Sequence, residues 1–224
     1  MKAMILAAGR GERMRPLTLE RPKPLLKVGG RTLLDWNLLR LAEAGVREAV
    51  INVSWLGSQI IDHCGDEHLG IRLSYSREAE PLETAGGIVQ ALPMLGPQPF
   101  MVVNADIWLN YDCRDLLDRQ LQPATAHLVL VDNPEHHPGG DFSLQEGLVR
   151  ERGEASLTYA GLGLYDPGFF ADCAPGRQPM LPLFERAIRQ SRLTGEHFSG
   201  VWTDVGTPER LRQLDKRLCA DFQG

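Results

Sequence analysis

Short apolar runs alternate with segments of helical spacing along the first half of the chain. Continuous apolar runs are typical of buried strands, whereas apolar residues three and four positions apart indicate a helix. Their alternation predicts a Rossmann-like α/β fold, with a mixed, mainly parallel sheet and helices on both faces. The expected strands lie near 4–6, 49–53, 71–76 and 100–103, and the expected helices near 33–44, 59–64 and 85–92.

The second half of the chain is less regular and mixes short strands with turns. Turn-forming residues concentrate between Asn133 and Phe142, and Thr207-Pro208-Glu209 supplies a cap, a proline and an acid for a final helix. Neither a repeat nor a linker interrupts the chain, so we expect one domain over residues 1–224. The other expected elements are helices near 114–121 and 183–190, strands near 127–131, 159–165 and 201–204, and a hairpin within 144–154.

Composition narrows the class of protein. The chain has 224 residues, of which 43% are hydrophobic, and this is enough to build a packed core. Its net charge of -5 argues against a nucleic-acid partner, because such proteins usually carry a basic face. The sequence contains neither a secretory signal nor an apolar run near the roughly 18 residues that span a bilayer. We therefore expect a cytoplasmic protein without a membrane partner.

The four cysteines, Cys64, Cys113, Cys173 and Cys219, are far apart and form no Cys-x-x-Cys pair. This spacing argues against a zinc site or a redox motif and favours reduced thiols with a structural role.

A glycine-rich segment, Ala7–Arg13, follows the first expected strand. Small residues at Ala8, Gly9 and Gly11 let an anion approach the main chain, where successive amides can form a nest. Arg13 adds a positive charge that suits phosphate. The segment indicates a phosphate-binding loop, and the alternative is a turn that only reverses the chain.

Two other phosphate-binding motifs do not fit this segment. A dinucleotide loop needs a third glycine where Met14 stands, and it needs an acid about 20 residues later, where Gly29-Gly30-Arg31 stands. A P-loop needs Gly-Lys followed by Ser or Thr, and none follows here.

Pro22-Lys23-Pro24 places a lysine between two prolines shortly after the loop. The prolines stiffen the backbone and keep Lys23 out of a helix. A lysine held in this way can meet developing charge without reordering. The alternative is an exposed lysine in a proline-rich loop.

Two acids follow expected buried strands, Asp106 in Asn104-Ala105-Asp106 and Asp204 in Trp202-Thr203-Asp204. Ligands of α/β sheets bind beyond the carboxyl ends of the strands, where an unpaired carboxylate is costly. Mg²⁺ is the natural partner, because it takes one or two protein carboxylates together with substrate phosphates. A plain turn at Asp106 and a helix cap at Asp204 remain the alternatives.

Two further segments are less decisive. Glu83 and Gly86 lie where an expected helix begins, so backbone amides there could face a nucleobase or a sugar phosphate. Thr84 as a helix cap, with glycines for close packing, is the alternative. The pair His136-His137 lies in a polar turn between two prolines, and we interpret it as a solvated loop rather than a metal site.

Taken in order along the chain, these segments resemble the sugar-1-phosphate nucleotidyltransferases, and the resemblance covers nearly the whole sequence. It implies in-line attack of a sugar-1-phosphate oxygen on the α-phosphorus of a nucleoside triphosphate, with release of pyrophosphate. The matching segments are Leu6 to Thr18, Arg21-Pro22-Lys23-Pro24-Leu25, Thr84-Ala85-Gly86, Asn104-Ala105-Asp106, Tyr159-Ala160-Gly161 and Trp202-Thr203-Asp204-Val205-Gly206.

The resemblance also implies roles for individual residues, with a nucleotide-binding half over about 1–110 and a sugar-binding half over about 111–224. The implied catalytic residues are Arg13, Lys23 and Asp106, and the implied Mg²⁺ ligands are Asp106 and Asp204. The implied nucleotide-binding residues are Ala8, Gly9, Gly11, Glu12, Arg13, Lys23, Glu83 and Gly86. The implied sugar-binding residues are Asn104, Asp141, Glu151, Tyr159 and Gly161.

Within the family, the resemblance implies UTP and an amino-sugar 1-phosphate, N-acetylmuramate α-1-phosphate first, in a cell-wall recycling route. Because N-acetylmuramate carries a lactyl carboxylate, a cationic side chain should contact that group, and Arg150 and Arg152 are both candidates. The alternatives are a mannose-1-phosphate guanylyltransferase and a non-catalytic sensor of nucleotide sugars. We expect a monomer, and no acetyltransferase activity because no hexapeptide repeat follows the domain.

Overall fold

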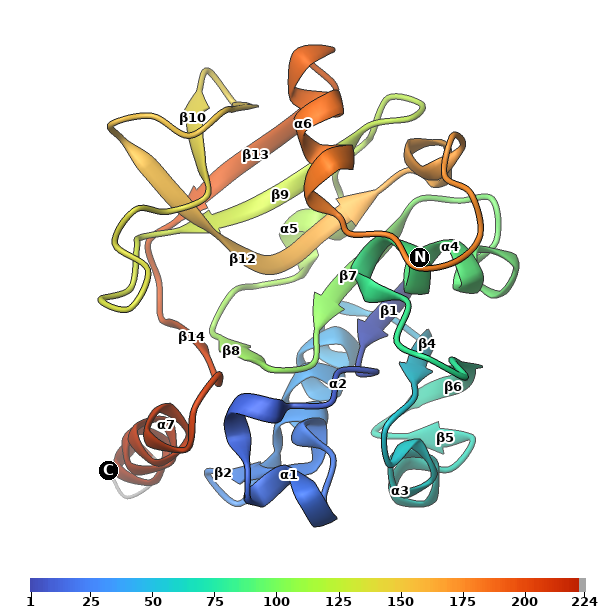
Figure 1. Ribbon diagram of the computed structural model, residues 1–224, viewed down its shortest axis with the longest axis vertical. Coiled ribbons are helices and arrows are strands. Elements are labelled where there is room, and N and C mark those ends of the chain that lie inside the picture. The colour runs from blue at the N-terminus through green and yellow to red at the C-terminus, as the bar shows by residue number, and fades with distance from the viewer. Residues whose placement is uncertain (222–224) are drawn as a thin grey trace.

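The computed structural model describes residues 1–221, and the last three residues of the expected domain, 222–224, lie outside the described part. The apolar runs join into one central ten-stranded sheet (Figure 1). Its strands, in spatial order, are β10 (Phe142–Gln145), β11 (Leu148–Arg150), β13 (Leu193–Phe198), β9 (Ala126–Val131), β12 (Ser156–Tyr165), β7 (Phe100–Asn104), β1 (Lys2–Leu6), β4 (Glu48–Val53), β6 (Ile71–Arg77) and β5 (Glu67–His68).

The direction of strand pairing divides this sheet. The strands β7, β1, β4 and β6 are parallel, as the strand–helix alternation predicts. The long strand β12 runs antiparallel to β7 and to β9, while β9 and β13 are parallel. The mixed sheet is confirmed, and the switch to antiparallel pairing at β12 separates the N-terminal part from the C-terminal part.

Helices cover both faces of the sheet because each buries an apolar stripe against it. On one face, α2 (Leu33–Ala44), α3 (Gly57–Cys64) and α5 (Arg114–Leu117) contribute Leu38, Ile60 and Leu116 to one apolar cluster. On the other face, α4 (Glu83–Leu95) and α6 (Leu181–Arg189) pack in a second cluster. The chain therefore has two apolar layers with the sheet between them.

A third, smaller apolar cluster lies between the segments that follow β1 and the last helix, α7 (Pro208–Asp221), elements that lie low in Figure 1. It joins the N-terminal segments to α7 through Met14, Val28, Val205 and Leu218. The short elements of the molecule are the helical turns η1 (Glu12–Met14), η2 (Lys23–Leu25) and η3 (Pro167–Phe170), the helix α1 (Leu17–Glu20), and the strand pairs β2 (Lys27–Val28) with β3 (Arg31–Thr32) and β8 (Ile107–Leu109) with β14 (Trp202–Asp204).

Local sequence explains most element boundaries. Helix α2 begins with a capping box between Thr32 and Asp35 and ends at Gly45, whose φ is 103°. One predicted helix was too long, since α5 ends at Leu117 rather than near 121. The residues after Leu117 are polar and lead to Pro123, so neither an apolar face nor the backbone favours another turn.

All four cysteines are free. Among residues 1–221, no helix combines the length and the apolarity that crossing a bilayer requires.

A partly buried polar cluster around Glu196 of β13 and His127 of β9 makes the free energy of unfolding depend on pH. The Glu196 carboxylate contacts His127 Nε2 at 3.3 Å and Arg119 Nη2 at 2.7 Å, and it accepts a hydrogen bond from the Tyr111 hydroxyl. The His127 hydrogen bond is the largest influence, and together these partners lower the pKa of Glu196 to about 2 against the opposing effect of burial.

We expect Glu196→Gln to lower the free energy of unfolding by on the order of 2 kcal/mol at neutral pH, after allowance for solvent screening. Because folding lowers the pKa of Glu196, the contacts of its ionised carboxylate stabilise the fold fully when the pH is above the ordinary pKa near 4.5. This stabilisation is lost as the pH falls toward about 2. Urea unfolding across pH 3–7 tests this, with the exposed Glu154→Gln as the matched control. A difference between variant and wild type that does not shrink with acid would contradict the assignment.

Candidate active site

A cavity of about 480 Å³ opens where three parallel strands end. Leu6 ends β1, Asn52 lies near the end of β4, and Asn104 ends β7, and all three line the cavity. This position is the usual ligand crevice of an α/β sheet. The remaining lining residues are Ala8, Gly9, Gly11, Glu12, Arg13, Met14, Lys23, Pro24, Glu78, Pro81, Glu83, Thr84, Ala105, Asp106 and Gly206.

The glycine-rich loop forms one wall of this cavity. Gly11 has φ of 62°, and a Cβ there would lie 2.9 Å from Thr18 Cγ2, so both conformation and space select glycine. No atom lies within 4 Å of the position that a Cβ would take at Gly9, so the backbone there is open on that side. The loop is anchored because Ala7 donates its N–H to Asn52 Oδ1 at 2.7 Å.

A short ion pair joins η2 to the turn that follows β7. Lys23 Nζ lies 2.5 Å from Asp106 Oδ2, and their side chains are 11% and 36% exposed. Pro22 precedes η2 and Pro24 lies within it, so Lys23 begins a short 3-10 turn rather than staying out of a helix as the sequence predicted. Lys23 lines the cavity. The backbone of Ala105 donates to the Leu6 carbonyl, which fixes the turn that carries Asp106.

The two acids expected to bind metal lie in adjoining backbone. Asp204 in β14 pairs with Ile107 in β8, and Val205 N donates to the Asp106 carbonyl at 2.8 Å. Both acids also line a second cavity of about 330 Å³, which shares Arg13 and Asn104 with the first. Two carboxylates at the junction of the cavities form a donor set that fits a hard divalent cation with phosphate oxygens as its other ligands.

Asp204 also has partners of its own, the guanidinium of Arg210 and the imidazole of His136. Arg210 Nη1 contacts both carboxylate oxygens, at 2.6 and 2.7 Å, and His136 Nε2 lies 2.9 Å from Oδ1. Arg210 stands in the first turn of α7, close to the helix start that Thr207 caps. Both acids are therefore charge-balanced by protein cations in the molecule as it stands.

The second cavity lies over β12, on the sugar-binding side expected from the sequence. Its floor includes the Tyr159–Gly161 backbone, at an irregularity in the pairing of β12 with β9. Gly161 has φ of 77°, and a Cβ there would lie 2.6 Å from Asn104 Nδ2, so glycine allows the amide to pack closely. The Tyr159 ring points into the apolar core, with its hydroxyl 3.0 Å from that of Tyr165.

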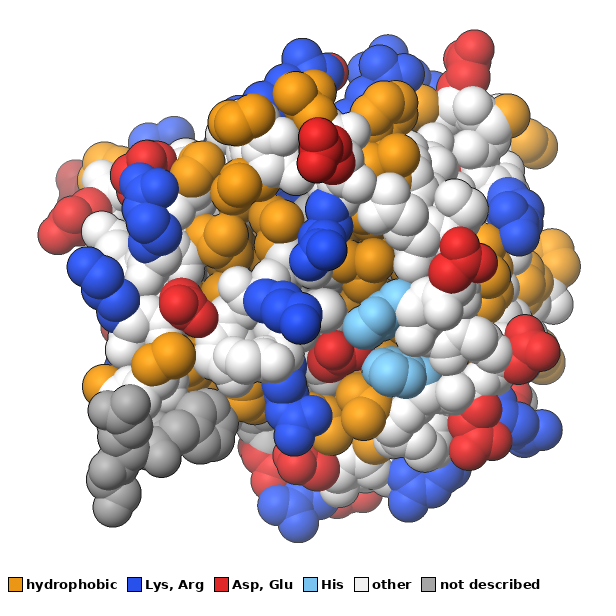
Figure 2. All heavy atoms as spheres, turned by 90° about the horizontal axis from the view of Figure 1, so that it is seen from below, with side chains coloured by type: hydrophobic (Ala, Val, Ile, Leu, Met, Phe, Trp, Pro, Cys, Tyr) orange, Lys and Arg blue, Asp and Glu red, His pale blue; other side chains and the backbone are white. Residues whose placement is uncertain are grey.

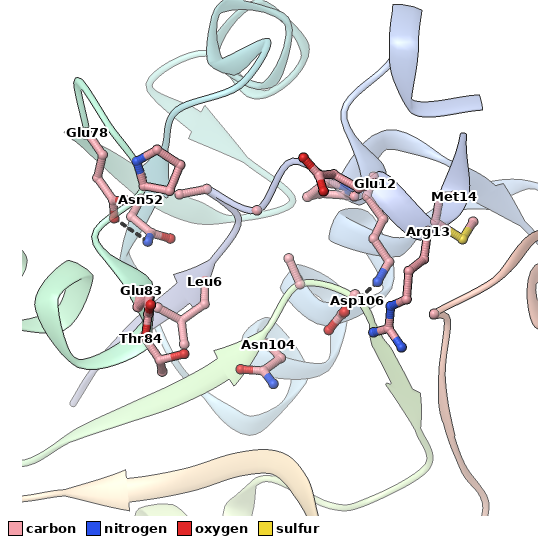
Figure 3. Close-up of a pocket in the computed structure, with 18 residues that line it drawn as sticks. Leu6, Glu12, Arg13, Met14, Asn52, Glu78, Glu83, Thr84, Asn104 and Asp106 are labelled. Carbon is pink, nitrogen blue, oxygen red and sulfur yellow. Dashed lines mark hydrogen bonds and ion pairs between the residues drawn. The ribbon is translucent and has the colours of Figure 1, made fainter. Parts of the chain in front are cut away.

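The other end of the first cavity lies at the start of α4. Glu83 adopts φ of 60° and pairs with Arg177, while Thr84 lies beside it (Figure 3). Glu78, only 6% exposed, accepts from Asn52 Nδ2 at 2.6 Å and from the Leu82 N–H at 3.0 Å. This end presents carboxylate and amide groups, whereas the opposite end presents Arg13 and Lys23.

Three expected site residues lie away from both cavities. Gly86 donates its N–H to the Gln178 carbonyl, and a side chain there would collide with Gly176, so its position matches the close-packing alternative. Asp141 lies behind the second cavity, where it accepts from the Tyr159 N–H at 2.8 Å and contacts His137 Nε2 at 3.0 Å. Glu151 is exposed just beyond β11 and lines neither cavity.

The structure adds residues that the sequence interpretation did not select. His136 and His137, interpreted as a solvated loop, line the second cavity, and His136 pairs with Asp204. The turn-rich sequence gave no sign of this placement. Asn52 could have been found, because it stands near the end of a predicted strand just as Asn104 does.

Comparison with known proteins agrees with this geometry. The Nucleotidyl transferase family model matches residues 2–143. A relative from Neisseria meningitidis serogroup B, N-acetylmuramate alpha-1-phosphate uridylyltransferase, is 49% identical over 95% of this chain and 96% of its own length. A protein of the same name from Caulobacter vibrioides is 37% identical over 97% of this chain and 96% of its own.

Solved structures share the fold at low sequence identity. A putative glucose-1-phosphate thymidylyltransferase from Bacillus anthracis, solved in complex with a sucrose, superposes with a TM-score of 0.86 at 20% identity. The match covers 98% of this chain and 95% of that one. The family generally uses a divalent metal ion, and its substrates are a nucleoside triphosphate and a sugar phosphate. By sequence along most of its length and by fold, this chain belongs to the nucleotidyl transferase family, as a sugar-1-phosphate nucleotidyltransferase.

Proposed function

We propose that this protein transfers the uridylyl group of UTP to N-acetylmuramate α-1-phosphate, giving the UDP-sugar and pyrophosphate. The observation that carries the reaction class is the placement of Asp106 beside Asp204 at the junction of two cavities, one of which contains the glycine-rich loop. The substrate pair is supported by the relatives named above, which match nearly the whole chain.

The larger cavity is the proposed nucleotide site. The backbone of Ala8, Gly9 and Gly11 would receive the triphosphate, with Glu12 beside it, while Arg13 and Lys23 supply positive charge. The base would lie at the end that contains Glu83, because the cations stand at the opposite end (Figure 3). A carboxylate can accept from the imide N–H of uracil, so Glu83 is a proposed base contact.

Asp106 and Asp204 are the proposed ligands of Mg²⁺, which when bound neutralises charge on the substrate phosphates. In the free enzyme these acids pair with Lys23 and Arg210. We infer that Lys23 leaves Asp106 for a phosphate oxygen when nucleotide binds. Lys23 then stabilises the negative charge that develops as the phosphate oxygen of the sugar attacks and pyrophosphate departs.

The second cavity is the proposed sugar site. Asn104 and the Tyr159–Gly161 backbone offer hydrogen-bonding groups to sugar hydroxyls. Asp141 would act indirectly, because it holds the Tyr159 amide and His137. Arg13 and the imidazoles of His136 and His137 line this cavity, so we propose these as partners of the lactyl carboxylate in place of Arg150 and Arg152, which line neither cavity.

We also propose that the chain works as a single domain and as a monomer. The two cavities adjoin across one continuous sheet, with residues up to about 110 forming most of the nucleotide site. Residues 134–161 and 202–204 supply most of the lining of the sugar site.

The test is pyrophosphate release with UTP, GTP, dTTP, ATP and CTP, each against a panel of sugar 1-phosphates. We expect UTP with N-acetylmuramate α-1-phosphate to give the highest kcat/KM, at least tenfold above any other pair, which is the discrimination that about 1.4 kcal/mol of transition-state binding supplies. A clear preference for GTP with mannose 1-phosphate would overturn the substrate assignment. Binding of nucleotide sugar without pyrophosphate release from any pair would favour the sensor.

A further inference from the structure

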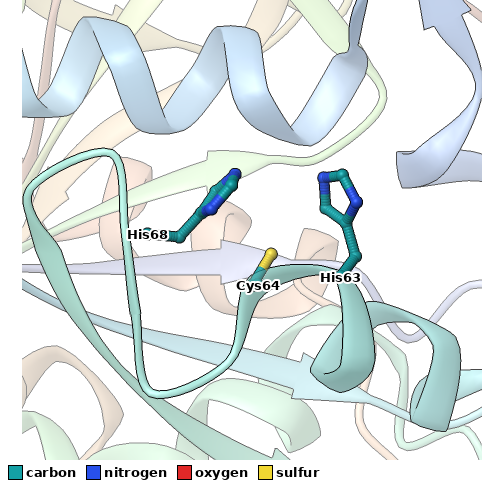
Figure 4. Close-up of side chains that lie close together, drawn as sticks. All are labelled: His63, Cys64 and His68. Carbon is teal, nitrogen blue, oxygen red and sulfur yellow. The ribbon is translucent and has the colours of Figure 1, made fainter.

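A second group of metal-binding side chains lies outside the active site, between α2 and the α3–β5 segment. His63, Cys64 and His68 place one ligand atom each within 4.8 Å of one another (Figure 4). Asp35 faces the same group, with its Oδ1 3.0 Å from His63 Nε2 and 2.8 Å from His68 Nε2. Two imidazoles and one thiol thus converge from two elements, and the Asp35 carboxylate on α2 faces both imidazoles.

These four side chains are held in place by the local fold. Asp35 uses its other oxygen, Oδ2, in the capping box of α2, which leaves Oδ1 directed at the histidines. Cys64 is the last residue of α3 and is 3% exposed. His68 lies in the short edge strand β5, paired with Ile71 across a tight turn.

We propose that Asp35, His63, Cys64 and His68 form a structural zinc site. Ligand atoms around one tetrahedral Zn²⁺ stand about 3.3–3.8 Å apart, given bond lengths of about 2.0–2.3 Å. The ligand atoms of His63, Cys64 and His68 lie within 4.8 Å of one another, so small side-chain rotations would bring them to these separations. Four protein ligands leave no open position, which is the hallmark of a structural rather than a catalytic zinc. The spacing of the cysteines had argued against a zinc site, but it could not indicate this one, because only one of the four proposed ligands is a cysteine.

The ligand types separate this site from the active site. Thiolate and imidazole select zinc, whereas a pair of carboxylates suits magnesium. When Zn²⁺ binds, the Cys64 thiol loses its proton to solvent and a sulfur–zinc bond forms, while the neutral imidazoles bind through nitrogen lone pairs. With the ionised Asp35, the two anionic ligands balance the charge of the ion.

A bound zinc ion would link the peripheral α3–β5 segment to helix α2. Helix α3 buries only Gly57, Ile60 and Cys64. Beside the cluster, Gln59 Nε2 donates to the Glu20 carbonyl at 2.9 Å, so α3 also contacts α1. In the space-filling view, histidine side chains gather beside an acidic side chain over α3 on the lower face, so the site is reachable from solvent (Figure 2).

The experiment uses the full chain, stripped with a chelator, desalted and kept in excess Mg²⁺ to occupy the active site. Titration with Zn²⁺ alone, against a chromophoric chelator, should give one ion per chain. The melting temperature should rise by about 5–10 °C when free Zn²⁺ exceeds Kd a hundredfold. Titration with Co²⁺ should produce the ligand-field bands of a tetrahedral ion and a thiolate-to-cobalt charge-transfer band in the near ultraviolet.

Two variants and two matched controls decide the assignment. Cys64→Ser should abolish the charge-transfer band, and His63→Gln, at a more exposed position, should weaken Zn²⁺ binding by on the order of 100-fold or more. Cys113→Ser and His136→Gln should leave the band and the affinity unchanged. Absence of binding in excess Mg²⁺, or equal binding by wild type and His63→Gln, would overturn the proposal and leave the cluster as a hydrogen-bonded network only.

Discussion

Asp106→Asn is expected to lower kcat for pyrophosphate release by on the order of 10³, the largest single effect on turnover that the structure suggests. The substitution keeps the size of the side chain but removes one of two carboxylates proposed to hold the metal ion. Metal neutralisation of transition-state charge contributes several kcal/mol, and about 4 kcal/mol corresponds to this loss. Steady-state pyrophosphate release at saturating UTP and sugar phosphate measures it.

The matched control is Asp112→Asn, an exposed acid that pairs with Arg114 and lines neither cavity. It should retain wild-type turnover. Because Asp106→Asn leaves the nearly buried Lys23 without its partner, a thermal melt of each variant should accompany the kinetics. A folded Asp106→Asn protein with kcat within tenfold of wild type would show that this carboxylate does not bind the catalytic metal.

Lys23→Met is expected to lower kcat by about 10²–10³, because a positioned cation is lost from the developing negative charge. Its second effect distinguishes the proposed exchange of partners from a simple loss of charge. Lys23 lies 2.5 Å from Asp106 and so competes with a cation for that carboxylate in the free enzyme. Removal of Lys23 should therefore tighten Mg²⁺ binding in the absence of nucleotide while turnover falls, as calorimetric titration would measure.

Lys27→Met, at an exposed position in β2, is the matched control and should change neither quantity. Lys23→Arg keeps the charge and should recover part of the lost turnover. If Lys23→Met weakened Mg²⁺ binding to the free enzyme, the lysine and the ion would not be competing for Asp106, and the proposed exchange would fail.

The sequence predicted the parallel part of the fold well because its determinants are local. The α2 boundaries follow from the Thr32–Asp35 capping box and from Gly45, and these act within one turn of the chain. The buried parallel strands appear as continuous apolar runs, since both faces are covered. The length of α5 was wrong because helical spacing was extended past Leu117 into polar sequence.

In the candidate site, too, some residues could be selected from short segments of sequence, whereas the placement of others depended on the tertiary structure. The loop at Gly11 and the lysine between Pro22 and Pro24 could be selected from short segments, since glycine and proline restrict the backbone wherever they stand. Gly86 was selected as a ligand contact from its place at an expected helix start and Glu151 from resemblance. The structure packs Gly86 against Gly176 and leaves Glu151 exposed beyond β11. These assignments depended on which way a residue faces.

By itself, the sequence determined the order of the main strands and helices, the glycine-rich loop after β1, and the positions of one acid just after β7 and one at the end of β14. Tertiary structure alone decided that Asp204 stands beside Asp106 through the β14–β8 pairing, and that His136 joins them. It likewise gathered His63, Cys64 and His68 around Asp35. The physical reason is that apolar periodicity and turn-forming residues act between neighbours in the chain. The contacts named here depend instead on pairing between segments that are distant in the sequence, which no local pattern encodes.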